Sequence, residues 1–390
     1  MVKTGGADYG MGNYQFGGTE NDCNVIDNFF AFKNFHINMA YPQKKSNSYI
    51  ENEYLEGHPN FRYKKVNILM GANATGKTSF GRMLMAAFNF MDKKQFQTLT
   101  EEISDEKNPA FFAMDFIVDE DALYRFHVKI RPKSGEKYQN SDIAVNIKKV
   151  HITKADSYES CSKRLDKVIL EQSSSYIEEL DKIKGLSWLF EYPSNPEISY
   201  NVHNLASDKS YLRILEYTLK SLDSSIKKVE RIDNVENSYV IRMEGCSVII
   251  QNGKIVDTNI LSSGTKAGIE IAGFLACILN GDYGFYYCDE KFSYIHSDIE
   301  KAFLAVMIQS LKSDDQLFFT THNTDILDLP LPKHSFTFLK KDSLDDIRPI
   351  KCIDVSQYLK HSTDSLKNAV DNDLFSAAPS VDYVYKIAEL

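Results

Sequence analysis

Eight consecutive residues, 71–78, have the types and the order needed to hold a phosphate. They read Gly-Ala-Asn-Ala-Thr-Gly-Lys-Thr and fit the pattern G-x-x-x-x-G-K-[ST]. Two glycines let the backbone approach phosphate oxygens, Lys77 can reach the β- and γ-phosphates of a nucleoside triphosphate, and the Thr78 hydroxyl can hold Mg²⁺. We therefore predict phosphate contacts from this loop and the residue after it: Gly71, Asn73, Ala74, Thr75, Gly76, Lys77, Thr78 and Ser79.

A second group of candidates follows two apolar runs. Asp289 and Glu290 end the run that starts at 283, and His322 follows the run 316–320. Ligands bind beyond the carboxyl ends of strands in open α/β sheets. We expect Asp289 to hold Mg²⁺ through water, together with Thr78, and Glu290 to orient or deprotonate the attacking water.

Each of these residues also has an ordinary interpretation. An isolated Asp-Glu pair is more often a solvated loop cap, but here the strand before it and the upstream phosphate loop favour catalysis. His322 could hydrogen-bond a γ-phosphate or the attacking water, or it could simply be a loop or helix-capping histidine. The catalytic candidates are Glu290, His322 and Lys77.

A third candidate segment is Leu-Ser-Ser-Gly-Thr-Lys at 261–266, directly before an apolar helix predicted over 267–279. Hydroxyl and N–H groups at a helix start can form an anion site. An ordinary serine N-cap would explain one serine of this string but not the whole of it. The candidate binding residues are Ser262, Ser263, Gly264 and Lys266.

Strands and helices must bring these segments together. Continuous apolar runs at 66–70, 283–288, 316–320 and 335–339 are typical of buried parallel strands, with helices predicted at 80–90 and 297–311. The alternation of strand and helix predicts right-handed crossovers and an α/β fold with a mostly parallel core sheet.

Other segments predict smaller units around that core. An antiparallel β subdomain is expected from 111–118, the alternating and half-solvated 124–130, and 142–150, and another strand is expected at 29–37. Further strands are expected at 239–243 and 246–250. The predicted organisation is a flexible Gly-rich segment 1–24, an N-terminal lobe 25–153 with the phosphate loop and the antiparallel subdomain, a helical insertion 154–235, a C-terminal lobe 236–350 and a helical tail 351–390.

Composition bounds the class of protein. The 390 residues are 43% hydrophobic and 25% charged, with a net charge of −9 and a pI of about 5.6, which argues against a generally basic nucleic-acid-binding surface. Six cysteines show no C-x-x-C pairing, so we expect reduced thiols in a cytoplasmic protein and no zinc site. The apolar run 268–279 is too short to span a bilayer, and we expect no signal peptide.

The order of the motifs resembles that of ABC-type ATPases. Residues 261–266 resemble the ABC signature, 283–290 the Walker B strand, 292–296 the D-loop and 320–323 the switch-histidine segment. Phe-Lys-Asn-Phe at 32–35 and the stretch 372–379 resemble the OLD and abortive-infection class, and within it the AriA-type ATPases of the PARIS anti-phage defence system. No Q-loop glutamine and no adenine-stacking aromatic is apparent.

The resemblance implies an ATPase that converts ATP and water to ADP and phosphate with Mg²⁺. It implies a homo-oligomer in which Ser263 and Gly264 of one subunit meet the γ-phosphate bound by another. No heptads for a coiled-coil arm and no TOPRIM nuclease domain are evident, and Asp364, Asp371 and Asp373 are scattered. The implied role is a sensor or scaffold in anti-phage defence, with a phage-encoded trigger and a separate effector such as a TOPRIM-type nuclease.

Besides a structural scaffold that does not hydrolyse ATP, two alternatives stay open at this point. One is a DNA-repair ATPase resembling RecF or a short chromosome-maintenance head, which would need a basic groove. The candidate residues for that groove, which could equally be solvated faces, are Lys148, Lys149, Lys163, Arg164, Lys227, Lys228 and Arg231. The other is a transporter subunit, which the signature string and the missing Q-loop disfavour.

Overall fold

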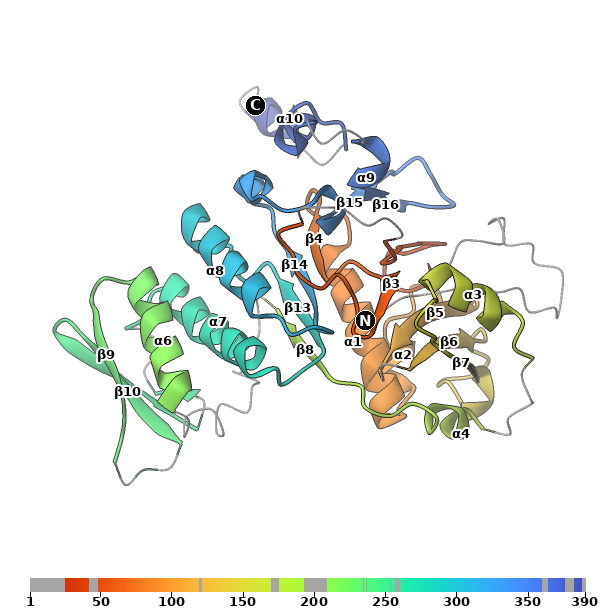
Figure 1. Ribbon diagram of the computed structural model, residues 1–390, viewed down its shortest axis with the longest axis horizontal. Coiled ribbons are helices and arrows are strands. Elements are labelled where there is room, and N and C mark those ends of the chain that lie inside the picture. Colours follow the sequence, from red (N-terminus) through yellow and green to blue (C-terminus); the bar gives the residue numbers. More distant parts are fainter. Residues whose placement is uncertain are drawn as a thin grey trace.

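The computed structural model describes most of the chain (Figure 1). The described residues are 25–41, 48–118, 121–169, 175–192, 209–233, 235, 237–252, 254–256, 260–359, 364–375 and 382–387. The segment 1–24, predicted to be flexible, lies outside them. Among the described residues, no helix combines the length and the apolar character needed to cross a membrane.

A six-stranded sheet forms the centre of the molecule. Its strand order is β16 (Ile350–Asp354), β15 (Phe336–Lys341), β4 (Val66–Met70), β14 (Gln316–Thr320), β13 (Phe285–Asp289) and β8 (Trp188–Glu191). All neighbouring pairs are parallel except β15 with β16. The predicted α/β fold with a mostly parallel core sheet is therefore what the chain adopts.

Helices cover both faces of this sheet. Helix α1 (Lys77–Lys93) lies on one face, and α7 (Ser263–Asn280) and α8 (Ser297–Ser310) lie on the other (Figure 1). Successive strand residues point to opposite faces, so Tyr287 packs in the cluster that contains α1, whereas Tyr286 packs in the cluster that contains α7. Burial on both faces explains why these strands are continuously apolar.

An antiparallel sheet packs beside α1. It has the order β1 (Ile26–Asp27), β5 (Ala110–Ile117), β6 (Ala122–Ile130) and β7 (Ile143–His151). The prediction of strands at 111–118, 124–130 and 142–150 is confirmed. The prediction that 124–130 is half-solvated is wrong, because every residue of β6 except Lys129 is buried. The even-numbered apolar residues of β6 face the α1 cluster, and Leu123 faces a second cluster that includes α3 (Tyr158–Asp166).

Arg125 of β6 is buried in an ion-pair network. The Arg125 guanidinium donates from Nε to Oδ1 of Asp115 at 2.7 Å and from Nη2 to Oδ2 at 2.8 Å, and both side chains are fully buried. It also contacts Asp166 and donates to the Ser162 hydroxyl of α3 at 2.7 Å. The Tyr158 hydroxyl donates to Oδ2 of Asp115 at 2.9 Å, so this network fixes α3 on the sheet.

We expect Asp115→Ala to lower the free energy of unfolding by about 3 kcal/mol, because it leaves the buried guanidinium without its bidentate partner. Urea unfolding followed by circular dichroism measures this loss. The matched control is Glu106→Ala, which removes an exposed pair with Lys133 and should cost only about 0–1 kcal/mol. Equal losses for the two variants would show that the buried network does not stabilise the fold.

A second antiparallel sheet lies at the opposite end of the molecule from the first (Figure 1). Its order is β12 (Lys254–Ile255), β11 (Cys246–Gln251), β10 (Ser238–Met243) and β9 (Ile226–Arg231), which confirms the strands predicted at 239–243 and 246–250. Helix α6 (Lys209–Leu222) packs between this sheet and α7. A Cβ on Gly268 would lie 2.4 Å from Cδ1 of Leu222, so the close α6–α7 contact depends on a glycine in α7.

Two predicted units differ from the structure. The insertion 154–235 contains α3, α4 (Tyr176–Leu180) and α6, but it also contributes β8 to the core sheet and contains β9, so it is not purely helical. The tail 351–390 begins within strand β16 rather than in a helix, and it continues with α9 (Val355–Tyr358), α10 (Leu366–Asp371) and α11 (Asp382–Ile387). The remaining short elements are β2 (Tyr54–Leu55), β3 (His58–Arg62), α2 (Gln97–Thr100), η1 (Asn140–Asp142), η2 (Thr324–Asp328) and η3 (Lys333–Ser335).

The prediction of a strand at 29–37 is also wrong. This stretch forms turns, with left-handed backbone at Phe30 and Asn34. Phe29, Phe32 and Phe35 are buried, with rings in the same cluster as α1. A compact aromatic turn therefore buries the apolar residues that the sequence pattern assigned to a strand.

Candidate nucleotide and metal site

The loop 71–76 connects the carboxyl end of β4 to the first turn of α1. Its backbone is left-handed at Ala74 (φ 62°) and Gly76 (φ 99°), and φ at Gly71 is 149°. A Cβ on Gly71 would lie 2.5 Å from the Leu339 carbonyl oxygen, so only glycine fits there. Within the described residues, the N-cap of α1 is Gly76 and supplies no side-chain hydrogen bond to the first turn, which suits the N–H groups of that turn to an anion.

The Lys77 ammonium is buried within this loop. Its Nζ donates to the carbonyl oxygens of Gly71 at 2.9 Å and Ala72 at 3.3 Å, and lies 3.3 Å from Oε1 of Glu290. Burial lowers the pKa of Lys77, and the nearby carboxylates of Glu290 and Asp289 oppose that change. A cation held at the mouth of the loop suits the phosphate role predicted for Lys77.

Asp289 and Thr78, the two residues predicted to hold a metal, are in contact. The Thr78 hydroxyl donates to Oδ2 of Asp289 at 2.7 Å, and the Thr320 hydroxyl donates to Oδ1 at 2.6 Å. Asp289 is fully buried, and burial raises the pKa of its carboxyl while the two hydroxyl hydrogen bonds lower it. A carboxylate beside a hydroxyl is the kind of oxygen donor set that Mg²⁺ takes.

Glu290 lies between Lys77 and His322. Nε2 of His322 is 2.8 Å from Oε1 of Glu290, the same oxygen that lies 3.3 Å from Nζ of Lys77. The hydrogen bond from His322 is the main cause that lowers the pKa of Glu290, so the carboxylate is ionised at neutral pH. Ionised carboxylates can accept a proton from water, and the three predicted catalytic residues therefore form one group.

The backbone of Glu290 has an unusual conformation. Its φ is 46°, in the left-handed region that glycine prefers. Its N–H donates to the Thr320 hydroxyl at 2.9 Å, so Thr320 binds both Asp289 and the backbone of Glu290. This contact ties the end of β13 to the end of β14.

The segment 261–266 lies apart from the group formed by Lys77, Glu290 and His322. Ser262 caps α7 and accepts a hydrogen bond from the N–H of Thr265 at 3.1 Å, as an ordinary N-cap does. Helix α7 covers the sheet face opposite α1. Within the described structure, four predicted binding residues therefore do not reach the phosphate loop of the same chain: Ser262, Ser263, Gly264 and Lys266. A Cβ on Gly264 would lie 3.3 Å from the Tyr294 carbonyl oxygen, so this segment adjoins the loop after Glu290.

Two residues at this site were not predicted from the sequence. Thr320 is described above. Tyr287 donates from its hydroxyl to the Lys77 carbonyl oxygen at 2.8 Å, and a Cβ on Gly81 would lie 2.4 Å from its ring. The glycine inside the otherwise bulky helix α1 is the sequence signal that could have pointed to this close approach.

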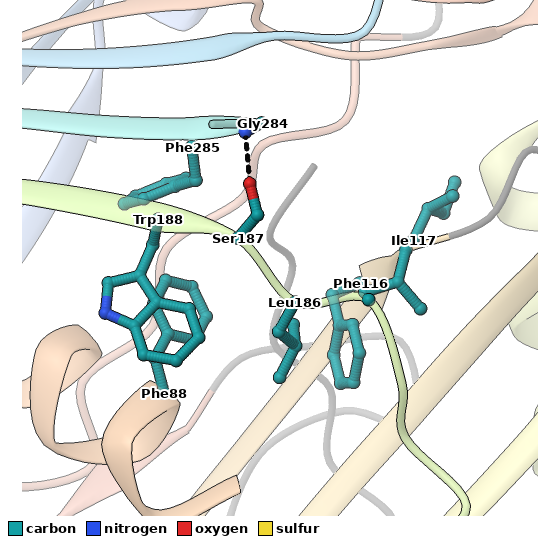
Figure 2. Close-up of a pocket in the computed structure, with 10 residues that line it drawn as sticks. Phe88, Phe116, Ile117, Leu186, Ser187, Trp188, Gly284 and Phe285 are labelled. Carbon is teal, nitrogen blue, oxygen red and sulfur yellow. Dashed lines mark hydrogen bonds between the residues drawn. The ribbon is translucent and has the colours of Figure 1, made fainter. Parts of the chain in front are cut away.

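Figure 2 shows a pocket at the other end of the core sheet, lined mainly by aromatic and aliphatic side chains. It lies where β8 and β13 begin, beside Trp188 and Phe285, and the Gly284 N–H donates to the Ser187 hydroxyl at 2.9 Å. Asp289 ends β13, so the pocket and the candidate metal residues lie at opposite ends of that strand. The pocket is therefore separate from the candidate nucleotide site.

Many of the basic side chains considered for a DNA groove contact acidic or polar neighbours. Lys227 pairs with Glu244, and Lys228 pairs with Glu230. Arg164 pairs with Asp156, Lys149 donates to the Tyr124 hydroxyl, and Lys148 is buried. These contacts reduce the positive charge that such a groove could offer to a phosphate backbone.

Comparisons with known proteins find several solved structures with a similarity to this chain. No family model matches it, and no curated protein matches it. An SMC head domain from Thermotoga maritima matches at 13% identity and a TM-score of 0.44, covering 85% of this chain and 97% of that one. An SmcHead bound to the C-winged helix domain of ScpA matches at 12% identity and a TM-score of 0.46, covering 77% of this chain and 94% of that one.

The recombination mediator protein RecF with ATP, from the RecFOR pathway, matches at 11% identity and a TM-score of 0.36, covering 77% of this chain and 91% of that one. At these identities and TM-scores, the likenesses assign neither a family nor an activity to the chain. The functional argument therefore rests on the residues of the site.

Proposed function

We propose that this protein is an ABC-type ATPase that binds ATP with Mg²⁺ and hydrolyses it to ADP and phosphate. The observation that carries the proposal is the grouping of Lys77, Glu290 and His322 beside the Thr78–Asp289 contact. All of these residues lie at the carboxyl ends of β4, β13 and β14 or in the turn of α1 that follows. This edge is where ligands bind in open α/β sheets.

The proposed roles follow from the contacts. The N–H groups of the loop 71–76 and of the first turn of α1 hold the phosphates, and Lys77 turns its ammonium from the loop carbonyls toward them. Thr78 and Asp289 hold Mg²⁺, which would neutralise charge on the phosphate oxygens. Glu290 orients the attacking water and accepts its proton, and His322 keeps the carboxylate oriented and ionised.

We propose that the site is completed by a second copy of the chain. Ser262 and Ser263 are exposed at the start of α7, which lies on the sheet face opposite α1. In a homo-oligomer around ATP, Ser263 and Gly264 of one subunit would contact the γ-phosphate held by another, supported by Ser262 and Lys266. N–H groups at a helix start are suited to contact with an anion.

The wider role rests on the sequence resemblance. We propose a cytoplasmic sensor or scaffold in bacterial anti-phage defence, of the kind that the AriA ATPase of the PARIS system represents. A phage-encoded trigger would alter the ATP-closed oligomer and so control a separate effector, such as a TOPRIM-type nuclease. Co-expression with the neighbouring gene product, followed by phage challenge, tests this role.

Phosphate release by the purified protein tests the activity itself. Release should require Mg²⁺, stop on addition of EDTA and return with excess Mg²⁺, because the donors at Thr78 and Asp289 need the ion to engage the phosphates. Asp289→Asn should raise the Mg²⁺ concentration needed for half-maximal rate by about tenfold or more. Equal release in EDTA would contradict the metal assignment, and no release under any condition would contradict the proposed function.

A further inference from the structure

Directly after Glu290, Lys291 forms the centre of a buried ion cluster. Its Nζ lies 2.5 Å from Oε1 of Glu191, contacts Glu270, and donates to the Tyr192 carbonyl oxygen at 2.8 Å. Lys291 is 3% exposed and Glu191 is 1% exposed. Burying such charges costs so much desolvation that stability alone is a weak reason for the cluster.

The cluster joins three parts of the molecule. Glu191 ends β8, the edge strand of the core sheet, and Glu270 lies about two turns into α7, the helix that begins at Ser263. Lys291 belongs to the loop that follows β13 and carries Glu290. The cluster therefore connects the proposed catalytic carboxylate to the helix proposed to act on a second subunit.

Glu290 needs such an anchor. Its left-handed backbone, with φ at 46°, is unfavourable for a residue with a Cβ by roughly 1–2 kcal/mol and must be held by its surroundings. On one side, the Glu290 N–H is held by the Thr320 hydroxyl. On the other side, the next side chain in the sequence is Lys291, which is fixed within the cluster.

The cluster contains more acidic groups than basic groups. Two carboxyl groups surround one ammonium, and burial raises the pKa of Glu191 to about 7 and raises that of Glu270 as well. The pKa of Lys291 is raised by its two carboxylate partners against the effect of burial. Lys291 is thus the cation that both carboxyl groups share, and its removal would leave them beside each other without a counter-charge.

We propose that Lys291 is a positioning residue: through its ion pairs with Glu191 and Glu270, it sets the backbone of Glu290 and couples that residue to the N-terminal segment of α7. This inference rests on the proposed ATPase function. In each subunit, Lys291 would link Glu290, which acts on the nucleotide bound by that subunit, to the start of α7, which contacts the nucleotide bound by the neighbouring subunit. Hydrolysis at one site and contact at the other then depend on the same three charges.

The test compares three purified variants of the full chain. Lys291→Met removes the cation, and Glu270→Gln removes one carboxylate but leaves the Lys291–Glu191 pair intact. The matched control is Lys64→Met, because Lys64 is also a buried lysine, paired with Asp354 at 2.8 Å near the amino end of β4, away from the site. Melting temperature, ATP affinity and steady-state kcat are measured for each.

We expect Lys291→Met to lower kcat at least tenfold while ATP affinity changes less than twofold, and Glu270→Gln to lower kcat several-fold at an unchanged melting temperature. Lys64→Met should lower the melting temperature and leave kcat within twofold of wild type. In a Glu290→Gln background, Lys291→Met should cause no further loss, because Lys291 acts through Glu290.

Folded Lys291 and Glu270 variants with wild-type kcat would overturn the inference and leave the ATPase function standing. If Lys291→Met does not fold, the kcat of Glu270→Gln decides. Wild-type protein that releases no phosphate would overturn both proposals.

Discussion

Glu290→Gln should lower the rate of ATP hydrolysis by about 10²–10⁴-fold while ATP binding is retained. The amide has the shape of the carboxylate but cannot accept a proton from water. Its neighbours Lys77 and His322 are kept, so the phosphate loop should retain its conformation. Single-turnover phosphate release with saturating ATP measures the chemical step, and equilibrium binding of a fluorescent ATP analogue measures affinity.

The same variant should accumulate as an ATP-bound oligomer, which light scattering coupled to size exclusion would detect. Glu230→Gln is a suitable control, because Glu230 lies on β9 in an exposed contact with Lys228 and Arg242. It should hydrolyse ATP at the wild-type rate. A Glu290 variant with normal turnover would show that another group activates the water.

Lys77→Ala should weaken ATP binding by about 100-fold, which would leave no binding detectable at micromolar concentrations. The change removes an ammonium that contacts two carbonyl oxygens of the phosphate loop. It also leaves Glu290, an ionised carboxylate, beside the phosphates without a cation between them. Isothermal titration with ATP and Mg²⁺ measures the affinity directly.

Lys93→Ala provides the control for this change. Lys93 lies in the last turn of the same helix, exposed and far along α1 from the loop. It should bind ATP as the wild type does, and both variants should melt within a few degrees of it. Normal ATP affinity in the Lys77 variant would place the nucleotide site elsewhere.

The core sheet could be predicted from the sequence because its strands are buried on both faces. The runs at 66–70 and 316–320 match β4 and β14 residue for residue. Because parallel strands place their carboxyl ends at one edge, the sequence predicted that Asp289, Glu290 and His322 lie beside the phosphate loop. It did not predict the side-chain contacts of Asp289 with Thr78 and of Glu290 with His322, which the structure shows.

Other features depend on contacts between distant segments. Strand β8 has four residues and is defined by its pairing with β13, about a hundred residues later. The alternation in β6 suggested a solvated face, but Asp115 neutralises the buried Arg125 from the neighbouring strand. The partners of Lys291 come from β8 and α7, and no local sequence pattern predicts these contacts.

Three consecutive side chains at the end of β13 contact three different parts of the molecule. Asp289 contacts Thr78, Glu290 contacts His322, and Lys291 contacts Glu191. Inserting or deleting one residue here would exchange all three neighbourhoods at once, because each side chain would take the place of the next. The length of this segment should therefore tolerate change far less than the composition of the loops around it, and a homologue with a gap at this point should be unable to hydrolyse ATP.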